Sequence, residues 1–388
     1  MRGYTGNWLE KVMQIGVDAR SLLPMRTGIG TYLAEILQHL SPTDTRGCFR
    51  LFSHRPVDIP AVPLVKTHIH PARWGLAWYL FQSWRSINSV ELDLFWGVQG
   101  LMPFGLRRQL PVVVTIPDCV HRMGVGYAPS ALYNYLHRLL LPVSVRRAQK
   151  ILTISRFVAG EIHQYYDVPL NQIEVISPGV SDHFFRSNIR EEKTQAVLEK
   201  YRILRPFIMA VGTLEPRKNL RTLLQAFAIL PLDLRGVYHL VLAGKMGWHS
   251  ESLDIDLRSH PLCSRIIRTG YISAHDLPHL YAGADMLVFP SLYEGFGFPA
   301  LEAMAAGCPV IASSTSGLGE LVGSAGILVD PYGPVLEWAR AIEKVARSSS
   351  LRDELIKKGI SRTREYRWSV CARTTVDLLY HIAGGGNS

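Results

Sequence analysis

The chain has 388 residues, of which 47% are hydrophobic and 19% are charged. This length favours two domains, and this composition excludes a wholly disordered protein. No apolar run approaches the roughly 20 residues of a membrane-spanning helix, and the N-terminal segment lacks the continuous apolar stretch of a secretory signal. The five cysteines lie far apart, without a C-x-x-C pair or a Cys/His cluster. We therefore expect no structural zinc site, no disulfide framework and a reducing, cytoplasmic location.

The formal net charge of +10 is unevenly distributed. Residues 1–200 contain 22 Lys and Arg against 15 Asp and Glu, an excess of +7, whereas residues 201–388 contain 20 against 17, an excess of +3. A basic half favours an anionic partner, such as nucleic acid, phosphate groups or an anionic membrane surface. A merely basic soluble protein is the alternative.

Short apolar runs alternate with helical patterns along the first half of the chain. The predicted strands are 13–18, 49–53, 92–96, 112–116, 150–154 and 173–176. The predicted helices are 30–40, 74–88, 131–148 and 155–166. This alternation is typical of a parallel sheet that is covered by helices on both faces.

The second half repeats the pattern, and we expect an α/β protein with two Rossmann-like, doubly wound domains facing a central cleft. The predicted strands are 207–212, 238–243, 265–269, 286–290, 309–312 and 326–329, and the predicted helices are 219–229, 276–283, 299–306, 334–347 and 351–365. The charged segment 183–201 shows no clear strand, so we place a linker there, between domains 1–182 and 202–365. In such sheets, ligands bind beyond the carboxyl ends of the strands.

A basic turn, TLEPRKN, follows the predicted strand 207–212 and precedes an amphipathic helix. We expect Arg217 and Lys218 in the turn and in the first helical positions. Backbone N–H groups already carry positive partial charge at a helix N-terminus, so two cations there make sense if an anion is bound between them. The alternative is a solvent-exposed basic turn.

Two glutamates follow the predicted strand 286–290 in the segment SLYEGFGFPALEAM. Glu294 falls in the loop and Glu302 in the first turn of the next helix, so both carboxylates can line one pocket and accept hydrogen bonds from sugar hydroxyls. Gly295 and Gly297 permit tight turns and the close approach of a ligand. The alternatives are complementarity to the helix dipole for Glu302 and a solvent-exposed loop acid for Glu294.

Two glycine-containing loops give weaker signals. Segment 313–320, SSTSGLGE, is a loop that enters a helix and can offer backbone N–H groups to phosphate. Gly28 and Gly30 follow the first predicted strand, but the third glycine of the dinucleotide-binding fingerprint is missing.

Together, these segments resemble the retaining GT-B glycosyltransferases called family 4. The resemblance is closest in 211–220, VGTLEPRKNL, and in 290–304, PSLYEGFGFPALEAM, which carries the family's two glutamates separated by seven residues. It extends from Ile15 to the last predicted helix and is looser in the first half. Within the family, the chain is most similar to bacterial mannosyltransferases that build lipopolysaccharide O-chains or exopolysaccharides.

The resemblance implies a role for each of these residues. Arg217 and Lys218 would hold the nucleotide diphosphate, Glu294 would face the donor hexose and Glu302 would bind the nucleotide ribose. With Asp118, the first three form the implied catalytic set. The last segment, 366–388, would be a helix that crosses back to the first domain.

The resemblance also implies a set of donor-binding residues. The segment after Glu294 would offer backbone N–H groups to sugar and phosphate, the strand end at 270–272 would contact the base, and the first glycine loop would face the donor phosphates and the acceptor. The implied set is Gly28, Gly30, Gly212, Thr213, Gly244, Lys245, Tyr271, Ile272, Gly295, Phe296, Gly297, Phe298 and Glu302.

One position departs from the family pattern. Many relatives have His-Asp directly after the strand that corresponds to 112–116, and that histidine contacts the donor sugar. Here Pro117 stands at the histidine position, while Asp118 is retained. His121 follows three residues after Asp118, and it either replaces the missing histidine or is a surface or structurally satisfied residue.

The implied activity is transfer of a hexose from a nucleotide sugar to a growing, lipid-linked cell-surface glycan, with GDP-mannose as the first choice of donor. We expect no metal, no other cofactor and no nucleic-acid partner. The Asp-x-Asp pattern of metal-dependent transferases occurs at 254–256, in a polar, helical stretch that we interpret as surface.

The first domain is also expected to bind the anionic inner face of the cytoplasmic membrane. At helical spacing, one face of segment 73–85 carries Trp74, Trp78, Phe81 and Arg85. A second basic site is expected at 146–150. The alternative is that the aromatic side chains pack into the core.

Three other functions remain open at this point. An epimerase or a phosphorylase can use the same architecture. An NAD-dependent oxidoreductase requires G-x-G-x-x-G with an acid about 20 residues later, which we do not find. A non-catalytic nucleotide-sugar-binding protein is compatible with Pro117.

Overall fold

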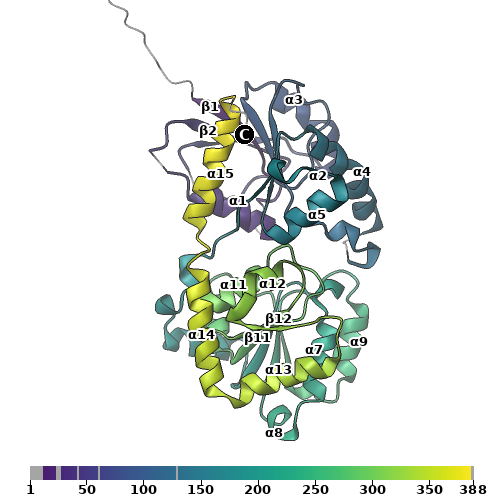
Figure 1. Cartoon of the computed structure of the whole chain (residues 1–388), viewed down its shortest axis with the longest axis vertical. Helices are drawn as coiled ribbons and strands as arrows, with labels where there is room; N and C mark the ends of the chain where they lie inside the picture. The colour runs from purple at the N-terminus through teal and green to yellow at the C-terminus, as the bar shows by residue number, and fades with distance from the viewer. Residues whose placement is uncertain (1–11, 23–27, 42, 60–61, 128–129, 386–388) are drawn as a thin grey trace, which may run out of the picture.

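The computed structural model describes residues 12–22, 28–41, 43–59, 62–127 and 130–385. Two α/β domains lie one above the other along the longest axis of the molecule (Figure 1). Each is a parallel sheet with helices on both faces, as predicted.

The first sheet has seven parallel strands in the order β3-β2-β1-β4-β5-β6-β7. They are β1 (Met13–Asp18), β2 (Gly47–Ser53), β3 (Val65–Ile69), β4 (Leu94–Gly97), β5 (Val112–Thr115), β6 (Lys150–Thr153) and β7 (Ile173–Val175). The helices around this sheet are α1 (Gly28–Gln38), α2 (Gly75–Phe81), α3 (Ser83–Asn88), α4 (Ala131–Arg147) and α5 (Arg156–Tyr166).

Two elements of the first domain differ from the sequence prediction. β3 was not predicted, because VKTHI has only two large apolar residues and forms a half-exposed edge strand. The single helix expected at 74–88 is interrupted at Gln82. There the Ser83 hydroxyl donates a hydrogen bond to the Tyr79 carbonyl, a local side-chain bond that competes with a regular helix.

The second sheet has six parallel strands in the order β10-β9-β8-β11-β12-β13. They are β8 (Phe207–Val211), β9 (His239–Ala243), β10 (Ile266–Gly270), β11 (Met286–Phe289), β12 (Val310–Ser313) and β13 (Ile327–Val329). The remaining helices, beginning with α6 inside the expected linker, are α6 (Glu191–Lys200), α7 (Leu220–Ala228), α8 (Leu232–Arg235), α9 (Glu251–Ser259), α10 (Leu277–Gly283), α11 (Phe298–Ala305), α12 (Ser316–Val322), α13 (Val335–Arg347), α14 (Ser349–Thr363) and α15 (Trp368–Ala383).

Eight short 3₁₀ segments complete the secondary structure of the described residues. They are η1 (Val120–Arg122), η2 (Val125–Tyr127), η3 (Leu170–Gln172), η4 (Asp182–Phe184), η5 (Arg186–Asn188), η6 (Pro216–Lys218), η7 (Cys263–Arg265) and η8 (Gly323–Ala325).

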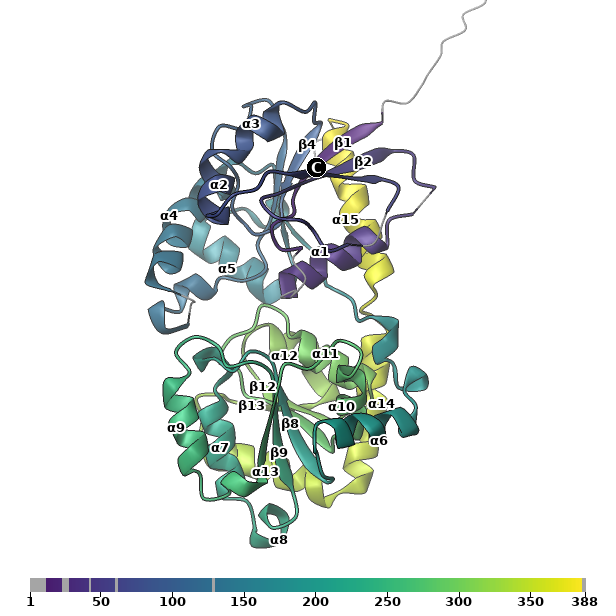
Figure 2. The same cartoon turned by 180° about the vertical axis from the view of Figure 1, so that it is seen from behind.

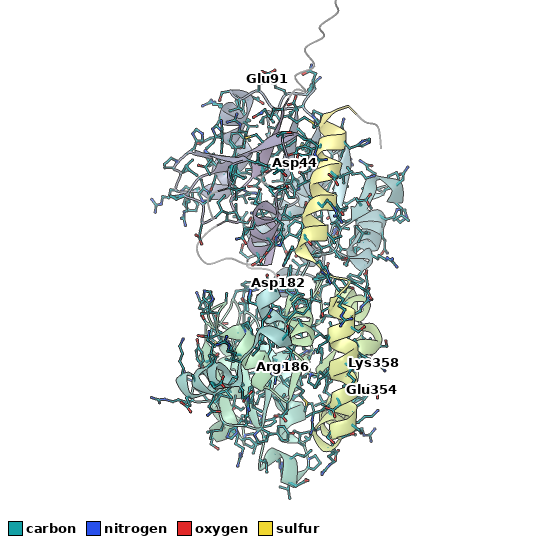
Figure 3. The ribbon with its side chains drawn as sticks, turned by 90° about the vertical axis from the view of Figure 1, so that its left-hand side faces the viewer. Asp44, Glu91, Asp182, Arg186, Glu354 and Lys358 are labelled. Atoms are coloured by element: carbon teal, nitrogen blue, oxygen red, sulfur yellow. The ribbon has the colours of Figure 1, made fainter. Side chains whose placement is uncertain are left out.

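The chain passes between the domains twice, and the two crossings lie side by side. Val180 on the first crossing forms an isolated parallel bridge with Arg367 on the second. Asp182 lies at this junction in Figure 3. Beyond it, the segment expected to be a linker contains α6, which packs against α10 (Figure 2).

The last helix returns to the first domain. α14 lies against the second domain, whereas α15 runs along the first domain and contacts α1, β1 and β4 (Figure 1). Leu379 and Tyr380 of α15 are buried in the same cluster as Ile15 and Phe49 of the first sheet. The core of the first domain therefore includes the C-terminal end of the chain.

Candidate functional site

The basic turn and the first glutamate meet where the order of the second sheet reverses. The strands β8 and β11 are neighbours there, although they are far apart in the sequence. Arg217 and Lys218 follow β8, and Glu294 follows β11. Both strands are almost entirely buried apolar runs, which is the pattern of central parallel strands. Such a switch point is where open α/β sheets bind their ligands.

Arg217 is held by acidic and carbonyl oxygens. Its Nη1 donates to the Glu294 carboxylate and to the Tyr293 carbonyl oxygen, both at 2.8 Å. Its Nη2 lies 2.7 Å from the Glu215 carboxylate. Glu215 was not predicted as a site residue, because one acid in a basic turn carries no distinguishing signal. These contacts fix the guanidinium in one orientation at the carboxyl end of β8.

Lys218 is buried beside the same acid. Its Nζ lies 2.6 Å from Oε1 of Glu294 and 4.8 Å from the centre of the Phe289 ring. Burial lowers the pKa of Lys218 and opposes the effect of Glu294. Both cations lie in η6, and α7 starts only at Leu220, so they do not occupy the first helical positions that we expected.

Glu294 remains ionised despite its burial. Burial acts to raise its pKa, but the charges of Arg217 and Lys218 outweigh it, and the pKa falls to about 2. Its backbone N–H donates to the Ser316 hydroxyl oxygen, and its carbonyl oxygen accepts from the Gly317 N–H. The carboxylate is thus a fixed anion that is shared by two fixed cations.

Asp118 comes from the first domain and faces this cluster. Burial raises its pKa, and the positive charge of Arg217 acts in the opposite direction. The preceding Pro117 carbonyl lies against Gly295 of the second domain, where an added Cβ would be 2.1 Å from the oxygen. Glycine at position 295 therefore allows the two backbones to approach closely across the cleft.

His121 does not take the place of the missing family histidine. Its side chain is 2% exposed, and its Nε2 lies 2.6 Å from the Tyr166 hydroxyl on α5. Burial lowers its pKa to about 3. The histidine is thus a structurally satisfied residue, which was one of the two interpretations of the sequence.

Glu302 lies on α11, on the side of the sheet that faces α10. Its Oε2 accepts a hydrogen bond from the Tyr281 hydroxyl at 3.0 Å. Burial raises the pKa of Glu302 to about 8. Tyr281 was not predicted as a site residue, because a buried tyrosine in a helix usually indicates only packing.

The other residues that were expected to bind the donor lie at the ends of β8, β9 and β10. Gly212 follows β8 and lies beside the Lys218 side chain, Thr213 is exposed, and Gly244 packs against the Gly212 backbone. An added Cβ at Gly244 would be 1.8 Å from the Gly212 carbonyl oxygen. The Lys245 ammonium lies 5.0 Å from the centre of the Tyr271 ring.

The side chains of some expected ligand residues point elsewhere. Ile272 is 8% exposed and belongs to the core, so only its backbone can face a base. Phe296 packs on Tyr366, and Phe298 stacks on Trp368 of α15. The segment 295–298 can therefore offer its backbone rather than these rings to a ligand.

The two glycine loops differ in what they can offer to a ligand. The N–H groups of Gly317 and Gly319 are already bonded, to the carbonyl oxygens of Glu294 and Thr315, so they are not offered to phosphate. Gly28 opens α1 and faces Phe298 across the cleft, where an added Cβ would lie 3.6 Å from the ring, whereas Gly30 is buried within the helix.

A cavity of about 460 Å³ lies between the domains on the other side of Glu215. Tyr127 borders it from the first domain, and Asn219, His249 and Asp256 border it from the second. Asp256 belongs to the Asp-x-Asp pattern, and its carboxylate pairs with Arg221 at 2.7 Å. Asp254 pairs with Arg258 and Arg268 on the exposed side of α9.

Within the described ranges, no three His, Cys, Asp or Glu side chains are grouped so that they could hold a metal ion. The same residues include no helix that is long and apolar enough to cross a membrane.

Comparisons with known proteins agree with this geometry. Residues 196–362 match the family model described as glycosyl transferases group 1, and residues 27–184 match the model of glycosyltransferase family 4. O-antigen chain mannosyltransferase B of Escherichia coli is 31% identical over 310 residues, covering 80% of this chain and 77% of that protein. The serotype-specific mannosyltransferase WbdA of E. coli is 33% identical over 247 residues, which are 63% of this chain and 30% of that protein.

A solved structure of similar fold is that of WaaG, a glycosyltransferase involved in lipopolysaccharide biosynthesis. It superimposes with a TM-score of 0.75 at 16% identity, covering 94% of this chain and 99% of that one. The two matching family models, the arrangement of the two sheets and the extent of the first relative lead to one conclusion: the chain belongs to the group 1, family 4 glycosyltransferases of GT-B fold.

Proposed function

We propose that this glycosyltransferase moves mannose from GDP-mannose to a lipid-linked cell-surface glycan. The observation that carries the proposal is the cluster of Arg217, Lys218 and Glu294 at the switch point of the second sheet. The choice of mannose is supported by the 31% identity to an O-antigen chain mannosyltransferase over most of both chains.

The cluster fits the chemistry of transfer from a nucleotide sugar. The bond between the anomeric carbon and the β-phosphate oxygen breaks, and its electron pair leaves with the diphosphate. Arg217 and Lys218 are fixed donors at the place where this negative charge grows, and they stabilise it in the transition state. The acceptor hydroxyl oxygen bonds to the anomeric carbon on the face that the diphosphate leaves, and its proton goes to the departing phosphate oxygen. This route retains the anomeric configuration and requires no metal ion.

Glu294 and Glu302 have different tasks in this scheme. Glu294 is the ionised acid next to the cations and faces the sugar, whereas Glu302 accepts hydrogen bonds from the ribose. The acceptor approaches from the first domain, where Asp118 lies, and the cavity beside Glu215 gives its glycan a path out of the cleft.

A second part of the proposal is binding to an anionic membrane surface. On α4, Leu132, Tyr135, Leu139 and Val143 are exposed and share one face at helical spacing. Trp74 and Phe81 at the ends of α2 are also exposed, and α2 and α4 lie on the same side of the first domain in Figures 1 and 2. Such an exposed apolar face suits the interface of a bilayer, whose anionic lipids would attract the basic first domain.

The structure corrects two details of the membrane expectation. Trp78 is 6% exposed and packs in the core, so it does not share the exposed face of Trp74 and Phe81. The second basic site is largely occupied, since Arg147 donates to the carbonyls of the 107–110 loop and Lys150 is buried. Arg146 remains exposed at the end of α4.

The test of the transferase proposal is the release of nucleoside diphosphate with and without an acceptor. We expect GDP release from GDP-mannose to rise strongly when a mannose oligosaccharide or a lipid-linked glycan is added. Mass spectrometry should then detect one additional hexose on the acceptor, with the α configuration of the donor retained. Binding of GDP-mannose without any transfer would instead favour a non-catalytic binding protein, and formation of a free epimer would favour an epimerase.

A further inference from the structure

The Tyr293 hydroxyl connects the two loops that carry the candidate catalytic acids. It accepts a hydrogen bond from the Cys119 N–H at 2.7 Å, and it donates one to Oε2 of Glu161 at 2.5 Å. Tyr293 directly precedes Glu294, and Cys119 directly follows Asp118. One buried hydroxyl therefore joins the acid loop of the second domain to the acid loop of the first.

Glu161 lies on α5 of the first domain and has no part in the assignments made above. Burial raises its pKa to about 7, the hydrogen bond from Tyr293 opposes this effect, and the negative charge of Asp118 adds to it. No motif in the sequence distinguished it. A half-buried carboxyl group that is bonded across the domain boundary calls for a functional explanation.

The start of α5 is bonded to the second domain as well. The Ser155 hydroxyl donates to the Gly295 carbonyl oxygen at 2.6 Å. The carboxylate of Glu320 on α12 accepts from the backbone N–H groups of Arg156 and Phe157, at 3.2 and 3.0 Å. α5 thus contacts the loop between β11 and α11 at two places: its N-cap residue Ser155 bonds to Gly295, and Glu161, further along the helix, bonds to Tyr293.

We propose that Glu161 is a positioning residue for glycosyl transfer: through the Tyr293 hydroxyl, it holds the Asp118 loop in register with the Glu294 loop. The inference rests on the proposed function, because its consequence for catalysis requires the transfer reaction. Reacting groups must be held in a near-attack arrangement, and a misplacement of about 1 Å can cost about 100-fold in rate. The bond from Tyr293 is strongest when Glu161 is ionised, because its acceptor is then charged.

The groups that face Glu161 determine the direction of its pH dependence. Asp118 and Cys119 approach it from the loop after β5, and Tyr293 approaches from the second domain. Tyr165 and Tyr166 are neighbours on its own helix, and the cation of Arg122 in η1 lies over both of their rings. The pKa of Glu161 is about 7, so its carboxyl group ionises as the pH rises through neutrality and the bond to Tyr293 strengthens.

The first experiment detects the connection without any assay of activity. Hydrogen exchange of the Cys119 amide should become faster in Tyr293→Phe, because that N–H loses its acceptor. The matched control is Tyr238→Phe, a buried tyrosine of the second domain at the start of β9, far from the cleft. It should leave exchange at Cys119 unchanged. Equal exchange in Tyr293→Phe and the parent protein would overturn the proposal.

The second experiment compares Glu161→Gln with Glu161→Leu in the transfer reaction. The amide oxygen of glutamine still accepts from Tyr293 but does not titrate, whereas leucine cannot accept at all. We expect Glu161→Leu and Tyr293→Phe to lower kcat by about 10- to 100-fold while the Kd for GDP changes little. Glu161→Gln should retain most of the parent's kcat at pH 8. In the parent enzyme, protonation of Glu161 should lower kcat between pH 8 and pH 6, and this contribution to the decrease should be missing in Glu161→Gln.

The outcomes separate this inference from the proposed function. If the parent protein transfers no mannose, the proposed function is wrong, and the exchange experiment still tests the connection. If the parent transfers mannose but Glu161→Gln keeps the parent pH profile, or Glu161→Leu keeps the parent kcat, Glu161 has no positioning role. The inference would also be contradicted if Glu161→Leu and Tyr293→Phe lost activity only in proportion to a lower Tm, and if Tyr238→Phe showed the same loss.

Discussion

The Lys218 ammonium and the Glu294 carboxylate lie 2.6 Å apart, and both groups are buried at the carboxyl ends of two neighbouring strands. Glu294 also pairs with Arg217, so it neutralises part of the charge of both cations when no ligand is bound. A diphosphate that enters must share Arg217 and Lys218 with the Glu294 carboxylate. Charge-assisted bonds of this kind are strong because both partners are ionised.

Lys218→Ala should therefore damage turnover more than folding. If Lys218 behaves like one donor of an oxyanion hole, its loss removes about 2.7–4 kcal/mol of transition-state stabilisation, or about 100- to 1,000-fold in kcat. The control is Lys358→Ala on α14, where the exposed lysine pairs with Glu354 (Figure 3). An unchanged kcat at saturating donor in Lys218→Ala would refute the assignment of this residue.

Glu294→Gln should separate donor binding from transfer. The substitution removes the negative charge that Arg217 and Lys218 share, so the cations become more available to a diphosphate and the affinity for bare GDP should not decrease. Transfer should be strongly impaired, because the sugar loses an ionised partner. Calorimetry with GDP and rates with GDP-mannose measure the two effects. A large loss of GDP affinity with normal turnover would reverse the assigned roles.

Glu302→Gln should weaken GDP binding and change its pH dependence. The pKa of Glu302 in the unliganded protein is about 8, so ribose binding to the carboxylate form requires the release of a proton. Affinity of the parent protein should then increase with pH up to about 8, by at most about tenfold per pH unit. Glu302→Gln should remove this contribution. Calorimetric titrations from pH 6 to 8.5 would detect it, and identical pH profiles would contradict a ribose role for Glu302.

The same residue predicts a change in stability. Its folded-state pKa of about 8 is higher than the ordinary value of 4.5, so the folded chain holds a proton that the unfolded chain releases between those pH values. Stability should therefore decrease as the pH rises through this window. Glu302→Gln abolishes that loss of stability. The Tm of the variant minus the Tm of the parent protein should therefore be larger at pH 8.5 than at pH 5.

Gly295→Ala should impair transfer through the backbone. The added Cβ would lie 2.1 Å from the Pro117 carbonyl oxygen, and a backbone oxygen cannot rotate away as a side chain can. The two acid-bearing loops would have to separate, and we expect a loss of about 100-fold in kcat. Gly160→Ala in α5 is a matched control, because no atom lies within 4 Å of its added Cβ. Equal activity of the two variants would show that this close approach is not needed.

Membrane binding should depend on anionic lipid and on α4. Liposome co-sedimentation should recover the protein with anionic vesicles and release it as salt increases, because salt screens surface charges. Leu139→Glu, at the centre of the exposed face of α4, should weaken binding, whereas Leu336→Glu on the exposed side of α13 should not. Equal recovery in the soluble fraction with neutral and anionic vesicles at low salt would contradict the proposal.

The pattern of strands and helices was predictable because the central strands are continuous apolar runs between polar segments. The positions of Arg217, Lys218 and Glu294 after central strands were also predictable, because these residues follow apolar runs in the sequence and carry a recognisable spacing. Edge strand β3 and the interruption at Gln82 were not, because both depend on packing rather than on hydrophobic period.

The hydrogen-bond partners of the site residues could not be predicted from the sequence for a different reason. Glu161 is 132 positions away from Tyr293 in the chain, and Tyr281 is 21 positions away from Glu302. Only the fold brings these side chains together, and neither Glu161 nor Tyr281 belongs to a local motif. The same holds for His121, whose partner Tyr166 lies on another helix.

The return of α15 to the first domain has a consequence for synthesis of the protein. Tyr380 contacts Gly47 and Phe49 on β2, so this strand completes its packing only against a residue that follows the whole second domain in the chain. The first half cannot finish folding while the second half is being made, although domains generally fold in order from the N-terminus. Nascent chains that stop before α15 should therefore expose the apolar surface of α1 and β2 and become substrates for chaperones and proteases.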